Sequence, residues 1–266
     1  MTISTFPRLS IITVTRNART ALLRTARSIA PLAARLDLEW IVVDGASGDG
    51  TRMWLESRDE PWLRSTSEAD AGLYDAMNKG IDRARGQFLW FVNAGDEVAD
   101  AAALAAIIDT CPPDLADRVL FADCLERETD GSLLLKTARD PAWLTYGLFA
   151  HHQGMLFGRN AIAGYRYQQR FSIAADFALV ARMWRDGIAF ERIRGPLAVF
   201  ERGGASATHA LTGLIEQARA RHEALGLPLW RVAAIAAAQL AAIAFRRSCP
   251  ALYDRLRFRR PQTAPA

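Results

Sequence analysis

Short apolar runs mark three strands in the first hundred residues. The runs LSIITV (9–14), EWIVV (39–43) and QFLWFV (87–92) are rich in β-branched and aromatic residues, which is typical of buried strands. Each run ends abruptly in polar residues or glycine, as a strand that enters a loop would. The pattern therefore predicts three buried strands, each followed by a polar loop.

Segments with helical spacing lie between and after these strands. Apolar residues recur on one face over 20–32, where Pro31 is a candidate stop signal, and again over 73–84. An alanine-rich helix is expected around 101–108. Alternating strands and helices predict an α/β fold with a mostly parallel, doubly wound sheet. Such sheets bind ligands beyond the carboxyl ends of their strands, where the polar loops of this chain should lie.

The second half of the chain is less regular. Strands are expected over 119–122 and 133–136, and 155–157 is a further candidate strand. Apolar spacing over 175–186 predicts a helix that ends at Gly187. A chain of 266 residues of this class commonly forms one domain, so we expect a domain over 1–227 and an appendage over 228–266.

The C-terminal appendage is apolar and then basic. Residues 232–245 are apolar apart from Gln239, but 14 residues fall short of the roughly 20 that cross a bilayer. Six arginines follow, namely Arg246, Arg247, Arg255, Arg257, Arg259 and Arg260. The segment is expected to be helical, and either to lie on an anionic membrane surface or to pack on the core or on a partner.

Composition narrows the class of protein. Half of the residues are hydrophobic and 23% are charged, with a net charge of +4, which is ordinary for a globular domain and excludes wholesale disorder. Three cysteines at unrelated spacings indicate neither a disulfide framework nor a metal knuckle. No basic module for nucleic acid is present. The N-terminal residues lack the pattern of a secretory signal, so a cytoplasmic location is expected.

Two strand-end loops carry carboxylates with candidate chemistry. Asp44 opens a glycine-rich loop, where it could accept hydrogen bonds from a nucleotide base or instead cap the helix that begins near Thr51. Asp96 lies in NAGDE (93–97), where it could hold a hard divalent cation on a diphosphate or lie in a solvated turn. The motif G-x-G-x-x-G does not follow the first strand, which argues against a dehydrogenase.

A third polar cluster lies on the predicted helix 73–84. Asp75, Asn78 and Lys79 are spaced to share one face of that helix. This face could contact phosphates or sugar hydroxyls, or it could be an ordinary solvated surface.

Four segments, taken in order and spacing, resemble family 2 of the inverting glycosyltransferases. They are TVTRN, VVDGASGDGT, SEADAGLYDAMNKGIDRARG and FLWFVNAGDE. The resemblance is closest to the bacterial branch that builds exopolysaccharide, capsule and glycolipid sugars. It is dense over 9–97 and thinner to about 204. It implies a GT-A (Rossmann-like) fold and transfer of a sugar from a nucleotide-diphosphate sugar to an acceptor hydroxyl, such as that of a lipid-linked glycan.

The resemblance also implies roles for individual residues. His152 and Gln153 would contact the donor phosphates or the acceptor, and Asp176, at a helix start, would be the catalytic base unless it is only an N-cap. Asp96 would hold Mg²⁺ or Mn²⁺ in place of the family's D-x-D motif, although Asn93 and Gly95 stand where carboxylates often do. The donor site would comprise Thr15, Asn17, Asp44, Asp70, Asn78, Lys79 and Asn93.

Two other functions remain open from sequence. A nucleotidyltransferase has a related sheet but needs a glycine-rich basic loop near its N-terminus, and TVTRNARTALL contains no glycine. A noncatalytic nucleotide-sugar sensor or scaffold is conceivable because the D-x-D element is depleted. The expected enzyme would act in the cytoplasm, peripherally on the inner face of the membrane if the appendage binds lipid.

Overall fold

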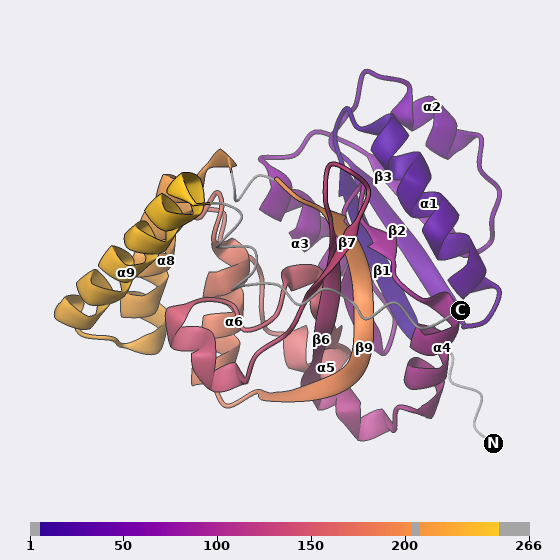
Figure 1. Ribbon diagram of the computed structural model, residues 1–266. Coiled ribbons are helices and arrows are strands. Elements are labelled where there is room, and N and C mark those ends of the chain that lie inside the picture. Colours follow the sequence, from indigo (N-terminus) through magenta and orange to yellow (C-terminus); the bar gives the residue numbers. More distant parts are fainter. Residues whose placement is uncertain (1–5, 204–207, 250–266) are drawn as a thin grey trace, which may run out of the picture.

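The computed structural model describes residues 6–203 and 208–249 and has a central sheet of nine strands (Figure 1). Along the sheet the order is β3-β2-β1-β4-β8-β6-β9-β5, and β7 pairs with β6 outside this path. The strands are β1 (Leu9–Thr15), β2 (Leu38–Asp44), β3 (Leu63–Ser67), β4 (Phe88–Phe91), β5 (Glu97–Val98), β6 (Arg118–Arg127), β7 (Leu133–Lys136), β8 (Met155–Gly158) and β9 (Ala189–Glu201).

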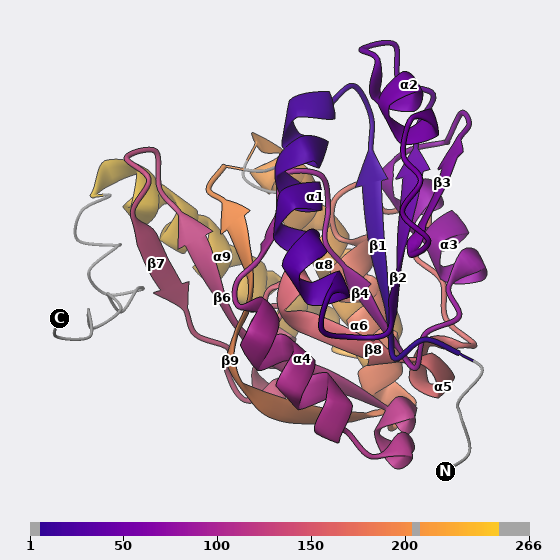
Figure 2. The same cartoon turned by 90° about the vertical axis from the view of Figure 1, so that its right-hand side faces the viewer.

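Helices cover both faces of this sheet. The α-helices are α1 (Arg19–Ala33), α2 (Thr51–Glu56), α3 (Leu73–Arg83), α4 (Ala101–Thr110), α5 (Arg159–Ile162), α6 (Ala175–Arg185), α8 (Ala210–Leu225) and α9 (Leu229–Ser248). The 3₁₀ helices are η1 (Pro113–Asp117), η2 (Pro141–Tyr146) and η3 (His152–Gly154). Figures 1 and 2 show α1 and α3 on opposite sides of β1 and β2. The α/β fold class predicted from sequence is confirmed.

The sheet is parallel in its first half and mixed in its second. The β3, β2, β1 and β4 strands run parallel, as predicted, and β6 and β9 are also parallel. The pairs β4/β8, β6/β8, β6/β7 and β5/β9 are antiparallel. The expectation of a mostly parallel sheet therefore holds only for the first half. In the second half β7 follows β6 through a short turn, and such a connection joins antiparallel strands.

Alternate side chains of the buried strands pack into two cores. On one face, Ile12 and Ile41 lie with Met77 of α3 and Phe177 of α6. On the other face, Trp40 and Trp90 lie with apolar residues of α1 and α4. Because strands buried on both faces need no polar side, their sequences read as continuous apolar runs.

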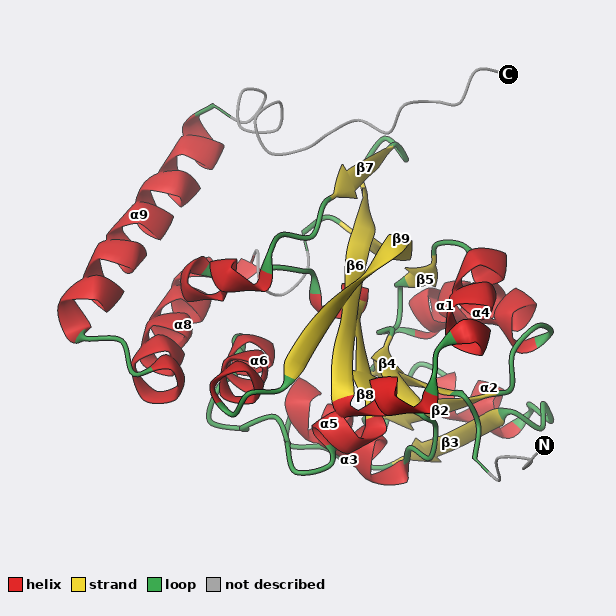
Figure 3. Cartoon of the chain, turned by 90° about the horizontal axis from the view of Figure 1, so that it is seen from below, coloured by secondary structure: helices red, strands yellow, loops and turns green. Residues whose placement is uncertain are grey.

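Helices α8 and α9 form a hairpin at the edge of the molecule, with α6 between them and the sheet (Figure 3). The expected C-terminal helix is thus present as α9, which begins at Leu229 after Pro228. Within the ranges that the structure describes, no helix is long and apolar enough to cross a membrane. Arg255, Arg257, Arg259 and Arg260 lie outside those ranges, and the side chains of Arg246 and Arg247 are not described.

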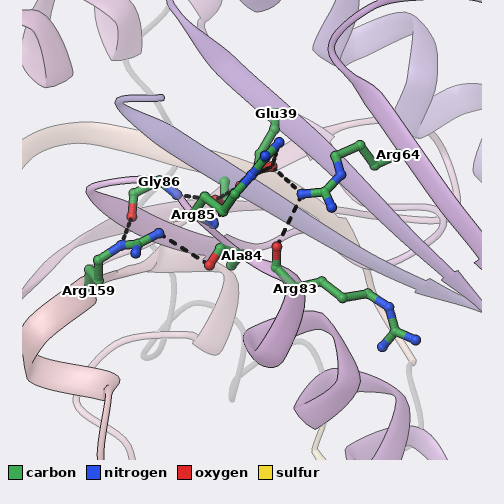
Figure 4. A network of polar contacts seen from close by, with 8 residues as sticks. Glu39, Arg64, Arg83, Ala84, Arg85, Gly86 and Arg159 are labelled. Carbon is green, nitrogen blue, oxygen red and sulfur yellow. Dashed lines mark hydrogen bonds and ion pairs between the residues drawn. The ribbon is translucent and has the colours of Figure 1, made fainter. Parts of the chain in front are cut away.

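A buried carboxylate fastens the sheet at the end opposite the polar loops (Figure 4). Glu39 of β2 is 4% exposed and accepts hydrogen bonds from Ser10 Oγ at 2.7 Å and the Arg85 amide at 2.6 Å. Arg64 donates to its second oxygen at 3.0 Å. Ser10 Oγ in turn accepts from the amide of Gly86, where an added Cβ would lie 2.4 Å from the Ser10 nitrogen. The chain entering β4 is therefore held closely against β1.

We expect Glu39→Gln to lower the free energy of unfolding by about 1–3 kcal/mol, the range for a hydrogen-bonded charge. Burial alone would raise the pKa of Glu39, but the hydrogen bonds from Ser10, Arg85 and Arg64 outweigh it and lower the pKa. The full difference in unfolding free energy should be seen above pH 4.5, the ordinary pKa of a glutamate. It should disappear as the pH falls through the lower pKa that Glu39 has in the folded protein. Urea unfolding at several pH values measures it.

The matched control is Glu191→Gln, since Glu191 pairs with Arg118 on the surface and should contribute less than about 1 kcal/mol. Equal effects of the two substitutions would contradict a structural role for the buried network.

Candidate active site at the carboxyl ends of the strands

Three polar loops meet at one edge of the sheet. Thr15 ends β1 opposite Asp44, which ends β2, and Asn93 follows β4 on the other side of β1. The Gly45 amide donates to the Thr15 carbonyl at 2.9 Å, and the Ala94 amide donates to the Val14 carbonyl at 3.3 Å. The structure thus brings the loops after β1, β2 and β4 together, as the parallel order requires.

Asp44 organises the loop that it opens. Its side chain is fully buried. Its oxygens accept hydrogen bonds from the Ser67 hydroxyl at 2.6 Å and the Ser47 amide at 3.1 Å, and also from the Ser47 hydroxyl. These contacts bind the end of β2 to the end of β3. Its role in binding a base stays a prediction.

Asn17 ties the loop after β1 to the loop after β2. Its backbone has a φ of +50°, a left-handed conformation that asparagine tolerates better than most residues. Its side-chain oxygen accepts from the Gly48 amide at 2.8 Å, and its own amide donates to Ser47 Oγ at 2.7 Å. The two loops form one rim, on which Thr15 Oγ1 is buried without a hydrogen-bond partner among the described residues.

Asp70 lies against the loop of Asp44. A Cβ on Gly45 would come within 2.3 Å of Asp70 Oδ2, so only glycine leaves room for this approach. The loop that carries Asp70 is anchored by Lys79, whose Nζ donates to the Ala69 carbonyl at 2.8 Å and lies 3.3 Å from Asp75 Oδ2. Asp70 therefore joins the site from the chain between β3 and α3, and Lys79 holds that chain in place.

Asp96 is the buried carboxylate of the loop after β4. Its Oδ2 accepts from Gln153 Nε2 at 2.7 Å and from the Asn93 amide at 3.2 Å. Burial raises the pKa of Asp96 to about 7, although the bond from Gln153 lowers it. An acidic group with so perturbed a pKa, held by a residue 57 positions away, is typical of a functional site.

The oxygens around Asp96 fit a hard divalent cation. The side-chain oxygens of Asn93 and Gln153 are both buried, and Asn93 Oδ1 has no hydrogen-bond partner in the part of the chain that the structure describes. Carboxylate and amide oxygens are the ligands that Mg²⁺ and Mn²⁺ prefer. Among the described residues no group of three His, Cys, Asp or Glu side chains could hold a metal.

His152 lies in an aromatic cluster behind this position. Its Nε2 is 2.7 Å from the Tyr167 hydroxyl, and its ring packs on Phe91 and Phe157. Burial lowers the pKa of His152 to about 4, so the imidazole is neutral near pH 7. Because the side chain is enclosed in this way, His152 fixes Tyr167 and the backbone next to Gln153.

Asn78 joins α3 to the same tyrosine. Its Nδ2 donates to the Tyr167 carbonyl at 2.9 Å, and its Oδ1 accepts from the Tyr167 amide at 2.8 Å. Both ends of the amide are therefore engaged with a backbone segment 89 residues away. Asn78 therefore connects α3, in the first half of the chain, to the segment around Tyr167 in the second half.

Asp176 lies in the first turn of α6, partly buried. Its Oδ1 accepts from the Phe177 amide at 2.7 Å, and burial, opposed by backbone hydrogen bonds, raises the pKa of Asp176 to about 6. The rings of Tyr74 and Tyr167 stack at 5.3 Å, and Tyr74 donates to the Ile173 carbonyl at 2.7 Å. Burial raises the pKa values of both tyrosines, and the negative charge of Asp176 raises them further.

These contacts close a ring around the strand ends. The ring passes from Asp44 through Gly45 and Asp70 to the start of α3, where Tyr74 stacks on Tyr167 and donates to the Ile173 carbonyl just before α6. It returns through Tyr167 and His152 to Gln153, Asp96 and the end of β4. Sequence reasoning missed Tyr74 and Tyr167. Tyr74 lies inside the segment SEADAGLYDAMNKGIDRARG, which resembles the family, and could have been singled out. No local sequence pattern marks Tyr167.

Comparison with known proteins places these features in a family. The family model described as Glycosyl transferase family 2 matches residues 10–120. An uncharacterized glycosyltransferase of Mycobacterium tuberculosis is 30% identical over 183 residues, which cover 66% of this chain and 68% of that protein. A PGL/p-HBAD biosynthesis glycosyltransferase of Mycobacterium bovis is 32% identical over 128 residues, 47% of this chain and 49% of its own length.

Solved structures share the fold. Staphylococcus aureus TarS 1–349 in complex with UDP-GlcNAc superposes with a TM-score of 0.62 at 17% identity, covering 91% of this chain and 74% of TarS 1–349. The mannosyltransferase PcManGT from Pyrobaculum calidifontis, in complex with GDP-Man and Mn²⁺, has a TM-score of 0.58 at 20% identity and covers 94% and 78%. At these identities the likeness establishes the GT-A fold alone.

Proposed function

The chain belongs to family 2 of the glycosyltransferases, and on this premise we propose that it transfers a sugar from a nucleoside-diphosphate donor to an acceptor hydroxyl with inversion of the anomeric carbon. The observation that carries the proposal is the ring of contacts. It joins the strand-end loops, which suit a nucleotide, to the segment that leads into α6, where the carboxyl of Asp176 has a raised pKa.

Asp176 is the proposed base. The acceptor oxygen forms a bond to the anomeric carbon while the bond from that carbon to the diphosphate breaks and its electron pair leaves with the nucleoside diphosphate. The acceptor proton passes to the Asp176 carboxylate. With a pKa of about 6 this group is mostly ionised at pH 7, and it is more basic than an ordinary aspartate.

The donor would lie on the loops after β1 and β2. Thr15, Asn17 and Asp44 form the rim there, and Asp70 reaches it past Gly45. Asn78 and Lys79 would act by holding the backbone around Asp70 and Tyr167. TarS binds UDP-GlcNAc and PcManGT binds GDP-Man, which supports a nucleotide sugar without selecting its base.

A divalent cation is the proposed cofactor. Asp96 would hold it, with the buried amide oxygens of Asn93 and Gln153. When bound, such an ion stabilises negative charge on a departing diphosphate. The Mn²⁺ in the PcManGT complex is consistent with this use.

The proposed acceptor is a lipid-linked glycan or glycolipid of the cell surface, presented at a membrane. The name of the Mycobacterium bovis relative supports this class. The α8–α9 hairpin carries six of the twelve exposed large hydrophobic residues of the described ranges, and Trp230 is 72% exposed. Helix α9 contains arginines and no acidic residue. This chemistry fits the surface of an anionic membrane on the cytoplasmic side.

Asp176→Asn should lower turnover at least about 100-fold while donor affinity stays nearly unchanged, because only proton removal is lost. In the wild-type chain, turnover should fall about tenfold per pH unit below the Asp176 pKa of about 6, since the protonated carboxyl cannot accept a proton. Release of nucleoside diphosphate from UDP-GlcNAc and GDP-mannose measures both. Normal turnover in the variant would remove Asp176 from this role.

Gly45→Ala should weaken donor binding at least about tenfold, because the new Cβ would displace the Asp70 carboxylate. Gly48→Ala, in the same loop, is the control, since no atom lies within 4 Å of its added Cβ. Calorimetric titration with the donor compares the two. Equal affinities would show that Asp70 does not contribute to the donor site from its observed position.

The full chain should float with liposomes that contain anionic lipid, and the double substitution Trp230→Glu and Leu240→Glu should reduce the bound fraction about tenfold. Trp184→Glu, at an exposed tryptophan on α6, is the control and should bind as the wild type does. If the unaltered chain stays with the soluble fraction at low salt, the hairpin serves packing or assembly instead.

A further inference from the structure

Glu216 of α8 makes an unusually complete set of contacts with the segment before α6. Its Oε1 accepts from the amide and the hydroxyl of Ser172, both at 2.8 Å. Its Oε2 accepts from the amides of Ile173 and Ala174, also at 2.8 Å. One carboxylate therefore receives four hydrogen bonds from three consecutive residues.

These bonds hold the residues that lead into α6. The N-cap residue of α6 is Ala174, whose side chain makes no hydrogen bond, and Glu216 binds the amides of Ala174 and of the two residues before it. The acceptor comes from another helix, 42 residues later in the chain. Burial alone would raise the pKa of Glu216, but the backbone hydrogen bonds from residues 172–174 outweigh it and lower the pKa. The group is thus an ion at neutral pH.

The segment that Glu216 holds leads directly to Asp176, the second residue of α6. Asp176 interacts electrostatically with groups of three elements. In addition to burial, its charge raises the pKa of Tyr74 of α3 and of Tyr167 in the chain before α6, and the charge of Glu216 of α8 raises the pKa of Asp176. Tyr74 also bonds to the Ile173 carbonyl, between two of the amides that Glu216 holds. The position of Asp176 therefore depends on α8 on one side and on α3 on the other.

Arg221 of the same helix binds the end of η2. It is fully buried and donates to the carbonyls of Thr145 at 2.8 Å and Tyr146 at 3.1 Å, at the end of η2. Its guanidinium lies 5.1 Å from the ring of Phe177, the residue after Asp176. Helix α8 is thus fixed to η2 through Arg221 and to the segment before α6 through Glu216.

We propose that Glu216 is a positioning residue, which fixes the start of α6 and thereby sets the place of the Asp176 carboxylate relative to the donor. The inference rests on the proposed role of Asp176 as base. It makes α8 a part of the catalytic apparatus, although the helix follows the α/β core in the chain. A positioning role should affect turnover and leave donor affinity intact, because the donor loops belong to other elements.

The test compares Glu216→Gln with Glu223→Gln in the full chain. Glu223 lies on the same helix and pairs with Arg170 and Arg219 on the surface, so it is a matched control. Turnover is the release of nucleoside diphosphate from UDP-GlcNAc or GDP-mannose, and affinity is measured by calorimetry. Glu216→Gln should lower kcat about 10- to 100-fold with donor affinity within about twofold, and Glu223→Gln should change neither.

Two further variants make the result decisive. In an Asp176→Asn background, Glu216→Gln should cause no additional loss, because residues that act as a unit are not additive. Ser172→Ala removes one of the four bonds without removing the charge, so it serves if Glu216→Gln folds poorly, and it should lower kcat about threefold.

Normal kcat in Glu216→Gln or, where that variant does not fold, in Ser172→Ala would overturn the inference. So would an equal loss with and without Asp176. Full activity of Asp176→Asn would instead show that the proposed base itself is wrong.

Discussion

The position of β1 between β2 and β4 is the constraint on which the site depends. All seven residues of β1 are buried, and the strand pairs in parallel with both neighbours, so that Thr15 lies opposite Asp44. Parallel pairing places the loops that carry Asn17, Asp44 and Asp96 at one edge of the sheet. If β1 shifted by one residue against its neighbours, each of its side chains would move from one core to the other. The packing of the two cores therefore fixes the pairing register of β1.

The second half of the chain completes the site through a few long-range contacts. Gln153 reaches Asp96, Tyr167 binds Asn78, and Tyr74 binds the segment before α6. Burial raises the pKa of both Asp96 and Asp176, which means that each carboxylate is held in an environment unfavourable to its charge. Carboxylates with such perturbed pKa values cluster at functional sites. Asp96 belongs to the ring of contacts, and Asp176 follows the segment that the ring holds.

The first half of the fold could be predicted from sequence because its strands are buried on both faces. The runs at 9–14, 39–43 and 87–92 match β1, β2 and β4 within a residue or two. The edge strand β3 was missed because LRSTS is polar, and β9 was missed because charged residues interrupt its first half. Helix α1 continues through Pro31 to Ala33, so the stop signal was placed slightly early.

The site residues on strand-end loops were accessible to sequence reasoning because parallel order alone brings those loops together. Tyr167 and Glu216 were not, since they act on residues tens of positions away and stand in no motif. The contacts of Asn78 and His152 show a related limit. Both side chains bind Tyr167, and no sequence pattern reveals these contacts.

Thermal unfolding of the purified chain with nucleotide sugars, with and without Mn²⁺, tests the central claim most directly. If the ring around Asp44, Asp70 and Asp96 binds a nucleotide-diphosphate sugar, then UDP-GlcNAc, GDP-mannose or a related donor should raise the Tm. A donor at 100 times its Kd stabilises the native state by about 2.7 kcal/mol, and Mn²⁺ should increase the effect. No shift with any nucleotide sugar at millimolar concentration, with metal present, would contradict the account.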